Sequence, residues 1–240
     1  MLEAAIWGLI GASSLVLGAI VALTMHPGHR IIGLLMAFGA GMLITSVSYE
    51  LVGDAIADGD AGSISVAMLI GALVYYAADR YIEGLGGDRP GLAASGEQIG
   101  GAPAIVVGAV LDGIPESFVL GLTVVSGSVN VALLAAVFVS NIPEALSSTA
   151  GLAEGSWSTR AILSMWTLIV VVSGLAAFAG YAYFTNNNNR TGKYVQAFAA
   201  GAILAMLTEA MMPDGFKFGG RLAGVFTVLG FIAGMGLNSV

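Results

Sequence analysis

The sequence predicts an all-α integral membrane protein with eight transmembrane helices, and three observations support this prediction. Charged residues make up only 10% of the chain, hydrophobic residues make up 57%, and the mean hydropathy is +0.91. Soluble domains carry about 25% charged residues, so this chain has too few charges to cover a water-facing surface. The apolar runs are continuous rather than alternating, which favours helices over a β-barrel. The 35 glycines also suit closely packed membrane helices.

Each of the predicted helices is an apolar run long enough to cross a bilayer. The first run follows Met1-Leu2-Glu3, which lacks the basic residues of a cleaved signal peptide, so we expect a retained helix. Short connections join the later runs, except for the glycine-rich segment 83–101. The expected spans are 4–24, 31–53, 63–82, 102–125, 129–152, 160–184, 192–213 and 220–238, all within a single transmembrane domain, 1–240.

The basic residues predict the orientation of these helices. If the N-terminus is outside, the cytoplasmic loops hold six of the eight Lys and Arg residues. Because cytoplasmic loops carry the basic excess, we expect a multi-pass protein of the cell membrane with both termini extracytoplasmic. Segment 83–101 is then a flexible cytoplasmic linker. The connection that contains Asp54, Asp58 and Asp60 is then external, either as an acidic vestibule that concentrates cations or as a solvated loop without such a role.

The composition excludes several other kinds of function. The chain has no cysteine, which removes disulfides, thiol catalysis and cysteine-based metal sites. Its formal net charge of −7 argues against a nucleic-acid partner. The two histidines, His26 and His29, lie in a short predicted loop, where simple solvation is favoured over a peripheral metal contact.

Three acidic residues lie near the centres of apolar spans, where an ionised carboxylate is costly unless it is paired or solvated. They fall in two segments, 111–117 and 139–145, which share an Ile-Pro-Glu motif at a spacing of 28 residues. Asp112 and Glu116 are four residues apart and therefore share one helix face. The short connection to the next span can bring Glu144 opposite that face. Neither span contains Lys, Arg or His.

Further oxygen atoms accompany these carboxylates. Pro115 and Pro143 cannot donate a backbone hydrogen bond to the preceding turn, which frees carbonyl oxygens beside the acids. Ser140 and Asn141 add a hydroxyl and an amide. Such an oxygen-rich site predicts a divalent cation; the alternative is that the acids are protonated and hydrogen-bond between helices. Oxygen ligands suit Mn²⁺, Mg²⁺ or Ca²⁺, and Zn²⁺ and Fe²⁺ also accept carboxylates.

A second, weaker repeat relates the two ends of the chain. The sequence Ala-Phe-Gly-Ala-Gly at 37–41 recurs as Ala-Phe-Ala-Ala-Gly at 197–201, 160 residues later. An acid follows each copy, Glu50 in the first case and Glu209 in the second. Spans 1–3 and 6–8 would then form inverted repeats around a central pair, as in many secondary transporters, although glycine- and alanine-rich helices also match by chance.

The paired motifs resemble the fourth and fifth helices of the ZIP (Zrt/Irt-like) metal transporters, whose pattern is roughly His-Asn-x-Pro-Glu-Gly. The resemblance extends to 41–43, to the Ala-Ala-Asp-Arg stretch at 77–80 and to the 3+2+3 order of helices, and so covers essentially the whole chain. It implies an elevator-like, alternating-access transporter that moves Zn²⁺, Fe²⁺ or Mn²⁺ toward the cytoplasm as its substrate, without a cofactor. The implied metal ligands are Asp112, Glu116, Glu144, Asn141, Ser140 and Met42, although core packing is the favoured role of Met42.

The chain departs from the family pattern at several ligand positions. Asp112 replaces the histidine of the fourth helix, Gly113 replaces the asparagine, and Ser140 begins the second motif. The span 160–184 contains no acid or histidine. We therefore expect one bound ion, because two divalent ions would bring more charge than three carboxylates can balance. Apposed carboxylates also bind protons more readily, so proton-linked transport is a hypothesis.

The expected partners are the divalent metal ion and the lipid bilayer, not nucleic acid, with a homodimer left open. A non-transporting metal sensor or scaffold with the same fold is the main alternative function. An intramembrane hydrolase is disfavoured, because Asp88 lacks a Gly-x-Gly-Asp context and the His-Glu-x-x-His motif is absent. We therefore expect that the protein is not an enzyme.

Overall fold

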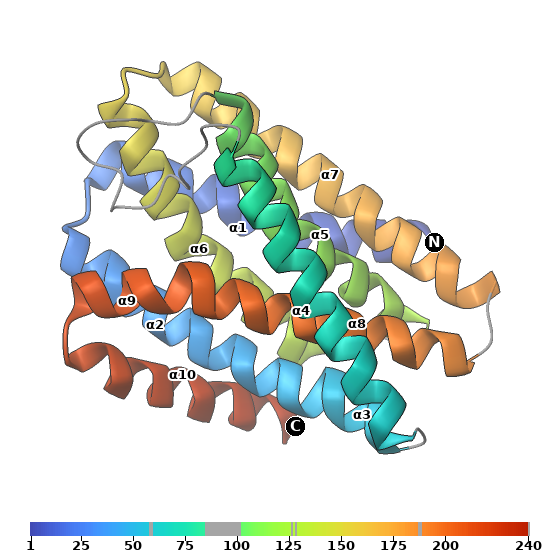
Figure 1. Cartoon of the computed structure of the whole chain (residues 1–240). Helices are drawn as coiled ribbons and strands as arrows, with labels where there is room; N and C mark the ends of the chain where they lie inside the picture. The colour runs from blue at the N-terminus through green and yellow to red at the C-terminus, as the bar shows by residue number, and fades with distance from the viewer. Residues whose placement is uncertain (58–59, 85–101, 126, 128, 187–188, 240) are drawn as a thin grey trace.

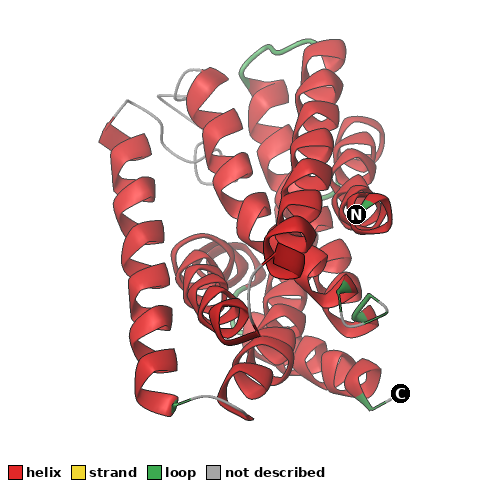
Figure 2. Ribbon diagram, turned by 90° about the vertical axis from the view of Figure 1, so that its right-hand side faces the viewer, coloured by secondary structure: helices red, strands yellow, loops and turns green. Residues whose placement is uncertain are grey.

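The computed structural model describes residues 1–57, 60–84, 102–125, 127, 129–186 and 189–239. The features expected at Asp58, at Asp88 and in most of the linker 83–101 lie outside these residues. Within the described residues every regular element is a helix, as Figures 1 and 2 show. The predicted all-α class is therefore confirmed.

The helices overlap the expected apolar spans. Two spans are parts of longer rods, because α2, η1 and α3 form one continuous rod and α8, η3 and α9 form another, where η denotes a π-helical segment. In chain order the elements are α1 (Leu2–Met25), α2 (His29–Ser46), η1 (Val47–Gly53), α3 (Asp54–Ala57), α4 (Ala61–Gly84), α5 (Ala102–Val124), α6 (Val131–Glu154), α7 (Thr159–Asn186), α8 (Asn189–Met206), η3 (Leu207–Met211), α9 (Met212–Gly219) and α10 (Leu222–Asn238).

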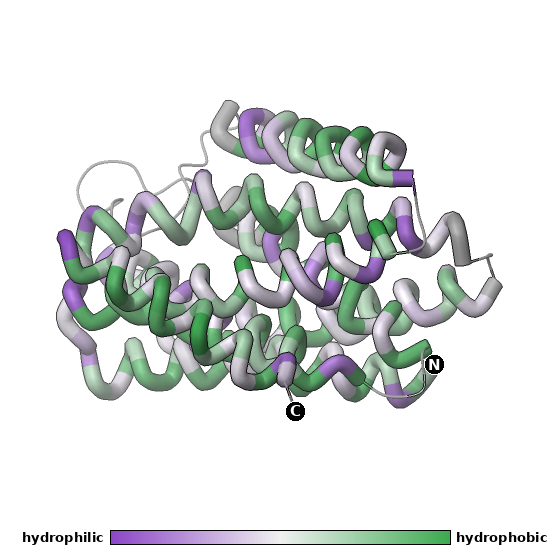
Figure 3. Tube along the Cα trace, turned by 90° about the horizontal axis from the view of Figure 1, so that it is seen from below, coloured by the Kyte–Doolittle hydropathy of each residue, from purple (hydrophilic) through white to green (hydrophobic). Residues whose placement is uncertain are grey.

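The helices have the length and surface of a multi-pass membrane protein. In the described chain, seven helices or rods are long and apolar enough to cross a bilayer. The last helix, α10, has 17 residues and at about 1.5 Å per residue is slightly shorter than a hydrocarbon core of about 30 Å. Large hydrophobic side chains are exposed along α4, α7 and α10, as expected for surfaces that face lipid. In Figure 3, hydrophobic colour covers most of the helix lengths, and α4 is hydrophilic at its two ends.

The helices pack in two groups. In the first group, α1 packs against α6 and α7, and α5 packs against α7. In the second group, α2 packs against α10, and α4 packs against α8. The two groups meet chiefly where α2 packs on α6, with smaller contacts between α5 and both α8 and α4. Among the candidate spans, the α2 rod is the most buried and α4 the least, so α4 lies at the edge of the bundle (Figure 3).

Glycine permits the close approach of helices in the second group. A Cβ atom on Gly41 of α2 would collide with the carbonyl oxygen of Thr227 in α10. In the same way, a Cβ atom on Gly201 of α8 would collide with the carbonyl oxygen of Met68 in α4. Small residues at such positions let membrane helices gain packing contacts that lipid cannot provide.

Two π-helical segments interrupt the long rods, and each contains one acid. Glu50 lies in η1 and Glu209 lies in η3. These are the acids that follow the two copies of the weaker sequence repeat. In the second rod the widened turn directly precedes Pro213, whose ring would clash with the carbonyl of residue 209 in a regular α-helix. Such π turns are rare and often occur at functional sites.

The polar residues near two helix ends have local structural roles. The carboxylate of Asp60 accepts hydrogen bonds from the backbone N–H and the hydroxyl of Ser63, both at 2.9 Å, and these bonds lower the pKa of Asp60. Asp60 therefore caps α4. This local role fits the interpretation of the acidic connection as a solvated loop rather than as a vestibule that concentrates cations. His26 ends α1 in the left-handed region, with φ of 46°. His29 begins α2 and packs edge-on against Phe218, with ring centroids 5.7 Å apart.

Candidate functional site

Helix α5 carries two of the predicted carboxylates in buried positions. Asp112 is 7% exposed and Glu116 is 2% exposed. The helix continues in α-helical form through Pro115, so these two residues lie one turn apart on the same face. Pro115 has no N–H, and α5 therefore lacks the backbone hydrogen bond to the carbonyl of Leu111. Two buried acids thus occupy successive turns of a membrane-spanning helix.

Asp112 is held by a residue of a different helix. The hydroxyl of Tyr75, in α4, donates a hydrogen bond to Oδ1 of Asp112 at 2.6 Å, and Tyr75 is 2% exposed. This distance lies in the range of charge-assisted O–H···O⁻ bonds. Sequence reasoning missed Tyr75; its only signal was a hydroxyl near the middle of an apolar span. The bond joins the second helix group to the first.

Helix α6 carries the second copy of the motif in a different environment. Ser140 and Asn141 are buried, and the Ser140 hydroxyl donates to the carbonyl of Val137 in the same helix at 3.0 Å. Glu144 is only half-buried. Like α5, the helix continues through its proline, Pro143. The α6 copy therefore buries neutral oxygens and leaves its acid more accessible.

Helix α2 packs closely on the α6 motif. A Cβ atom on Gly39 would lie 2.9 Å from the Cα atom of Ser140, so a larger residue at position 39 would push the two helices apart. Met42, one turn further along α2, is 3% exposed and belongs to a hydrophobic cluster that includes Leu43 and Val137. This packing favours the core role of Met42 over a ligand role.

The expected convergence of three acids is not seen in the described residues. No three His, Cys, Asp or Glu side chains among them are grouped closely enough to hold a metal ion. The reason lies in helix packing: α5 packs chiefly on α7, whereas α6 packs on α1 and α2. The short connection between α5 and α6 does not by itself make them close partners, and Asp112 faces Tyr75 of α4.

A second polar contact joins the two helix groups at the start of α6. Asn130 caps α6, where its Oδ1 accepts from the backbone N–H of Leu133 at 2.9 Å. The Asn130 amide also donates to the carboxylate of Glu50 in η1. Close by, the hydroxyl of Ser46 donates to the carbonyl of Ala132 at 3.4 Å. The acid that sequence analysis noted only as part of a repeat is thus bound to the beginning of a motif helix, through an asparagine that it missed.

Helix α7 contributes a hydroxyl to this region. It contains Ser173, which is 2% exposed. A Cβ atom on Gly113 would lie 3.3 Å from the Ser173 Oγ, so this hydroxyl lies beside the α5 motif. Sequence analysis considered only acids and histidines in this span and therefore did not identify Ser173.

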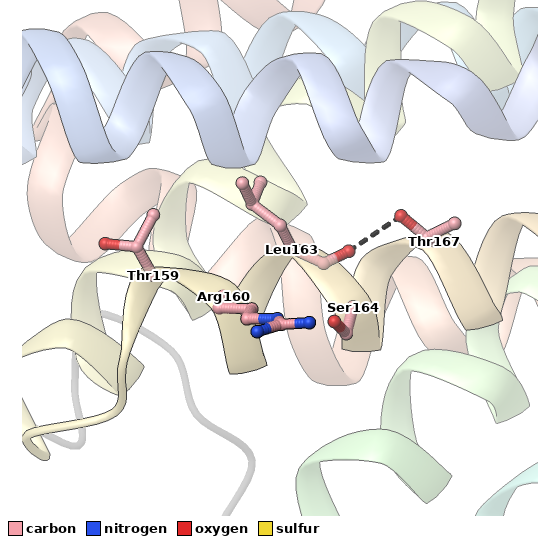
Figure 4. Close-up of a pocket in the computed structure, with 5 residues that line it drawn as sticks. All are labelled: Thr159, Arg160, Leu163, Ser164 and Thr167. Carbon is pink, nitrogen blue, oxygen red and sulfur yellow. Dashed lines mark hydrogen bonds between the residues drawn. The ribbon is translucent and has the colours of Figure 1, made fainter.

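A surface pocket lies at the beginning of α7 (Figure 4). None of the predicted metal ligands lines it, so it is not part of the candidate site. Within it, the hydroxyl of Thr167 donates to the carbonyl of Leu163 at 2.7 Å, which leaves this hydroxyl bonded to its own helix. The lining residues are Thr159, Arg160, Leu163, Ser164 and Thr167.

The sequence matches no protein-family model and no curated protein. The buried polar residues, and the way in which the helices hold them, are the features of this chain that bear on its function.

Proposed function

We propose that this protein transports a divalent metal ion of the Zn²⁺, Fe²⁺ or Mn²⁺ class across the cell membrane toward the cytoplasm, as a divergent relative of the ZIP transporters. One observation carries this proposal: Asp112 and Glu116 are buried on one face of a membrane-spanning helix. Neither α5 nor α6 contains Lys, Arg or His to balance them. A divalent cation bound beside them would balance these carboxylates, and the ion is cargo rather than the cofactor of an enzyme.

In this proposal a single ion binds between α5 and α6. Asp112, Glu116 and Glu144 supply negative charge, while Asn141 and Ser140 supply neutral oxygen. Glu144 is half-buried and joins the α5 acids when the ion offsets the repulsion among the carboxylates. The same repulsion makes the carboxylates bind protons when no cation balances them, so metal entry displaces protons and links transport to the proton gradient.

The packing of the helices supports alternating access. The helices that carry the ligands, α5 and α6, belong to the first group, whereas α2 packs with α10, α4 packs with α8, and these two pairs are joined where α8 contacts η1 and α2 contacts α9. We propose that the first group moves past the second and exposes the ion to each side of the membrane in turn. The hydrogen bonds from Tyr75 to Asp112 and from Asn130 to Glu50 cross this boundary and must rearrange during the movement.

We also infer a 3+2+3 inverted repeat with both termini extracytoplasmic. Gly41 of α2 packs closely against α10, and Gly201 of α8, which lies 160 residues later, packs against α4 in the same way. These matching contacts support an equivalence of the two halves. A π-helical segment with one glutamate follows each of these glycines. The bias of Lys and Arg toward alternate loops supports the orientation.

Reconstitution tests the proposed function directly. Purified protein in liposomes is offered Zn²⁺, Fe²⁺, Mn²⁺, Mg²⁺ and Ca²⁺ in turn, with an internal pH dye and with protein-free liposomes as the control. We expect saturable uptake of at least one of the first three ions, accompanied by proton movement. Metal binding without flux would instead indicate a sensor or scaffold, and the absence of both binding and flux would overturn the proposal. Flux without a pH change would reject only the proton linkage.

A further inference from the structure

Tyr75 lies on the narrow buried face of a helix whose other residues are mostly exposed, as expected of a surface that faces lipid. It is 2% exposed, whereas its neighbours Val74 and Tyr76 are 51% and 50% exposed. Among the described residues, Tyr75 is one of the largest fully buried side chains. A buried phenol needs a hydrogen-bond partner, and here the partner is a carboxylate. The hydroxyl is therefore directed at a specific atom, Oδ1 of Asp112.

The backbone that carries Tyr75 is held firmly in place. One turn before it, a Cβ atom on Gly71 would collide with the carbonyl oxygen of Phe198 in α8. Nearby, Gly201 of α8 meets the carbonyl of Met68 in the same close manner. These two contacts lock α4 against α8, so the phenol reaches Asp112 from a fixed position rather than from a mobile surface helix.

We propose that Tyr75 is a positioning residue that makes Asp112 bind the ion through a single oxygen, and that it thereby selects small divalent ions over Ca²⁺. This inference rests on the proposed function. The hydrogen bond to Oδ1 fixes the rotation of the carboxylate and draws electron density from Oδ1, which makes that oxygen the poorer ligand. Partners of metal ligands act in this way in protein metal sites.

The selectivity follows from the number of ligands that each ion requires. Ca²⁺ takes about six to eight oxygens and often both oxygens of a carboxylate, whereas smaller divalent ions use fewer ligands at shorter distances. A carboxylate restricted to one oxygen therefore disfavours Ca²⁺ more than Mn²⁺ or Zn²⁺. Tyr75 thus excludes Ca²⁺ from a site whose oxygen ligands alone would accept it.

The substitution Tyr75→Phe removes the hydroxyl and keeps the ring, so it separates this role from packing. Mn²⁺ uptake into proteoliposomes is measured over a range of Mn²⁺ concentrations and with Ca²⁺ as competitor. We expect the half-saturating Mn²⁺ concentration to rise by about tenfold with little change in the maximal rate. The Ca²⁺ concentration that halves Mn²⁺ uptake should fall by a comparable factor. This competition ratio does not depend on the amount of active protein, so it remains informative if the variant is less abundant.

Two comparisons complete the test. Tyr76→Phe is the matched control, since it makes the same change one residue away on the exposed face, and it should leave both quantities unchanged. In an Asp112→Ala background, Tyr75→Phe should have no further effect, because Tyr75 acts through the side chain of Asp112. If the wild type transports Mn²⁺ but Tyr75→Phe changes neither the half-saturating Mn²⁺ concentration nor the competition by Ca²⁺, this inference alone is overturned. The absence of divalent uptake by the wild type overturns the proposed function and this inference together.

Discussion

The two motifs share the sequence Ile-Pro-Glu but have very different surroundings. In α5 the motif buries two acids on one face, and one of them is fastened to Tyr75. In α6 the residue 28 positions after Asp112 is Ser140, whose hydroxyl donates to the carbonyl of its own helix. The acid of α6, Glu144, is only half-buried.

The difference follows from the partners of each helix. Helix α5 packs against α7 and contacts α4, whereas α6 packs against α1 and α2. The close approach of Gly39 to Ser140 fills the space beside the α6 motif with backbone. A repeated sequence therefore does not produce equivalent ligands. In the proposed site, α5 would therefore provide most of the charge and α6 would complete it.

The largest effect is expected at the most buried acid. Glu116→Gln preserves shape and removes one charge, so the half-saturating Mn²⁺ concentration for uptake should rise by at least about 100-fold, the upper end of the losses seen at metal-site partners. The matched control is Glu154→Gln, the same change at the exposed end of α6, which should behave like the wild type. If the Glu116 variant is correctly inserted and still shows normal uptake, Glu116 does not bind the ion and the proposed role of α5 is contradicted.

The same change in the α6 motif should have a smaller effect. Glu144 is less buried than Glu116, so fewer protein atoms enclose it and it should contribute less to an ion held beside α5. Glu144→Gln should raise half-saturation by about tenfold, the lower end of the same range. If the Glu144 and Glu116 variants lose affinity equally, the two motifs contribute equally and α5 does not provide most of the charge.

Asp112→His would introduce the imidazole found at this position of the ZIP pattern and should alter selectivity more than affinity. Imidazole favours Zn²⁺ over harder Mn²⁺. The Zn²⁺/Mn²⁺ uptake ratio should rise by about fivefold, equivalent to roughly 1 kcal/mol. Competition uptake in the wild type and the variant measures this ratio directly. An unchanged ratio would mean that Asp112 does not contact the ion.

The smallest effect is expected at Ser140, the counterpart of Asp112. Its hydroxyl is a neutral ligand that already donates to Val137, so Ser140→Ala should raise half-saturation by about threefold, within the range of one neutral hydrogen bond. Titration of uptake with Mn²⁺ provides the measurement. A loss as large as that of the Glu116 variant would place the main ligands on α6 instead.

The helices and the buried acids could be predicted from the sequence because both depend on local patterns. Hydropathy identified the apolar runs, and the four-residue spacing of Asp112 and Glu116 predicted a shared face. The packing partners could not be predicted in this way. Helix α5 meets α7 because Gly121 lies against the carbonyl of Ala177, a contact between residues far apart in the chain. The short connection to α6 gave no sign of it.

Two polar residues that bind carboxylates on other helices were missed for a similar reason. Tyr75 and Asn130 are neither acidic nor basic, and each becomes informative only when tertiary packing brings it to a carboxylate. The π-helical segments around Glu50 and Glu209 were equally hidden, since a widened turn leaves no periodic pattern in the sequence. The weaker repeat nevertheless identified both positions.

Anomalous diffraction from crystals soaked in Mn²⁺ tests the central claim most directly, because it locates the ion without reference to transport. We predict one strong peak between α5 and α6, within about 2.0–2.6 Å of carboxylate oxygens of Asp112, Glu116 and Glu144. A peak that lies away from Glu116, or two strong peaks about 3.5–4 Å apart between these helices, would contradict the single carboxylate site.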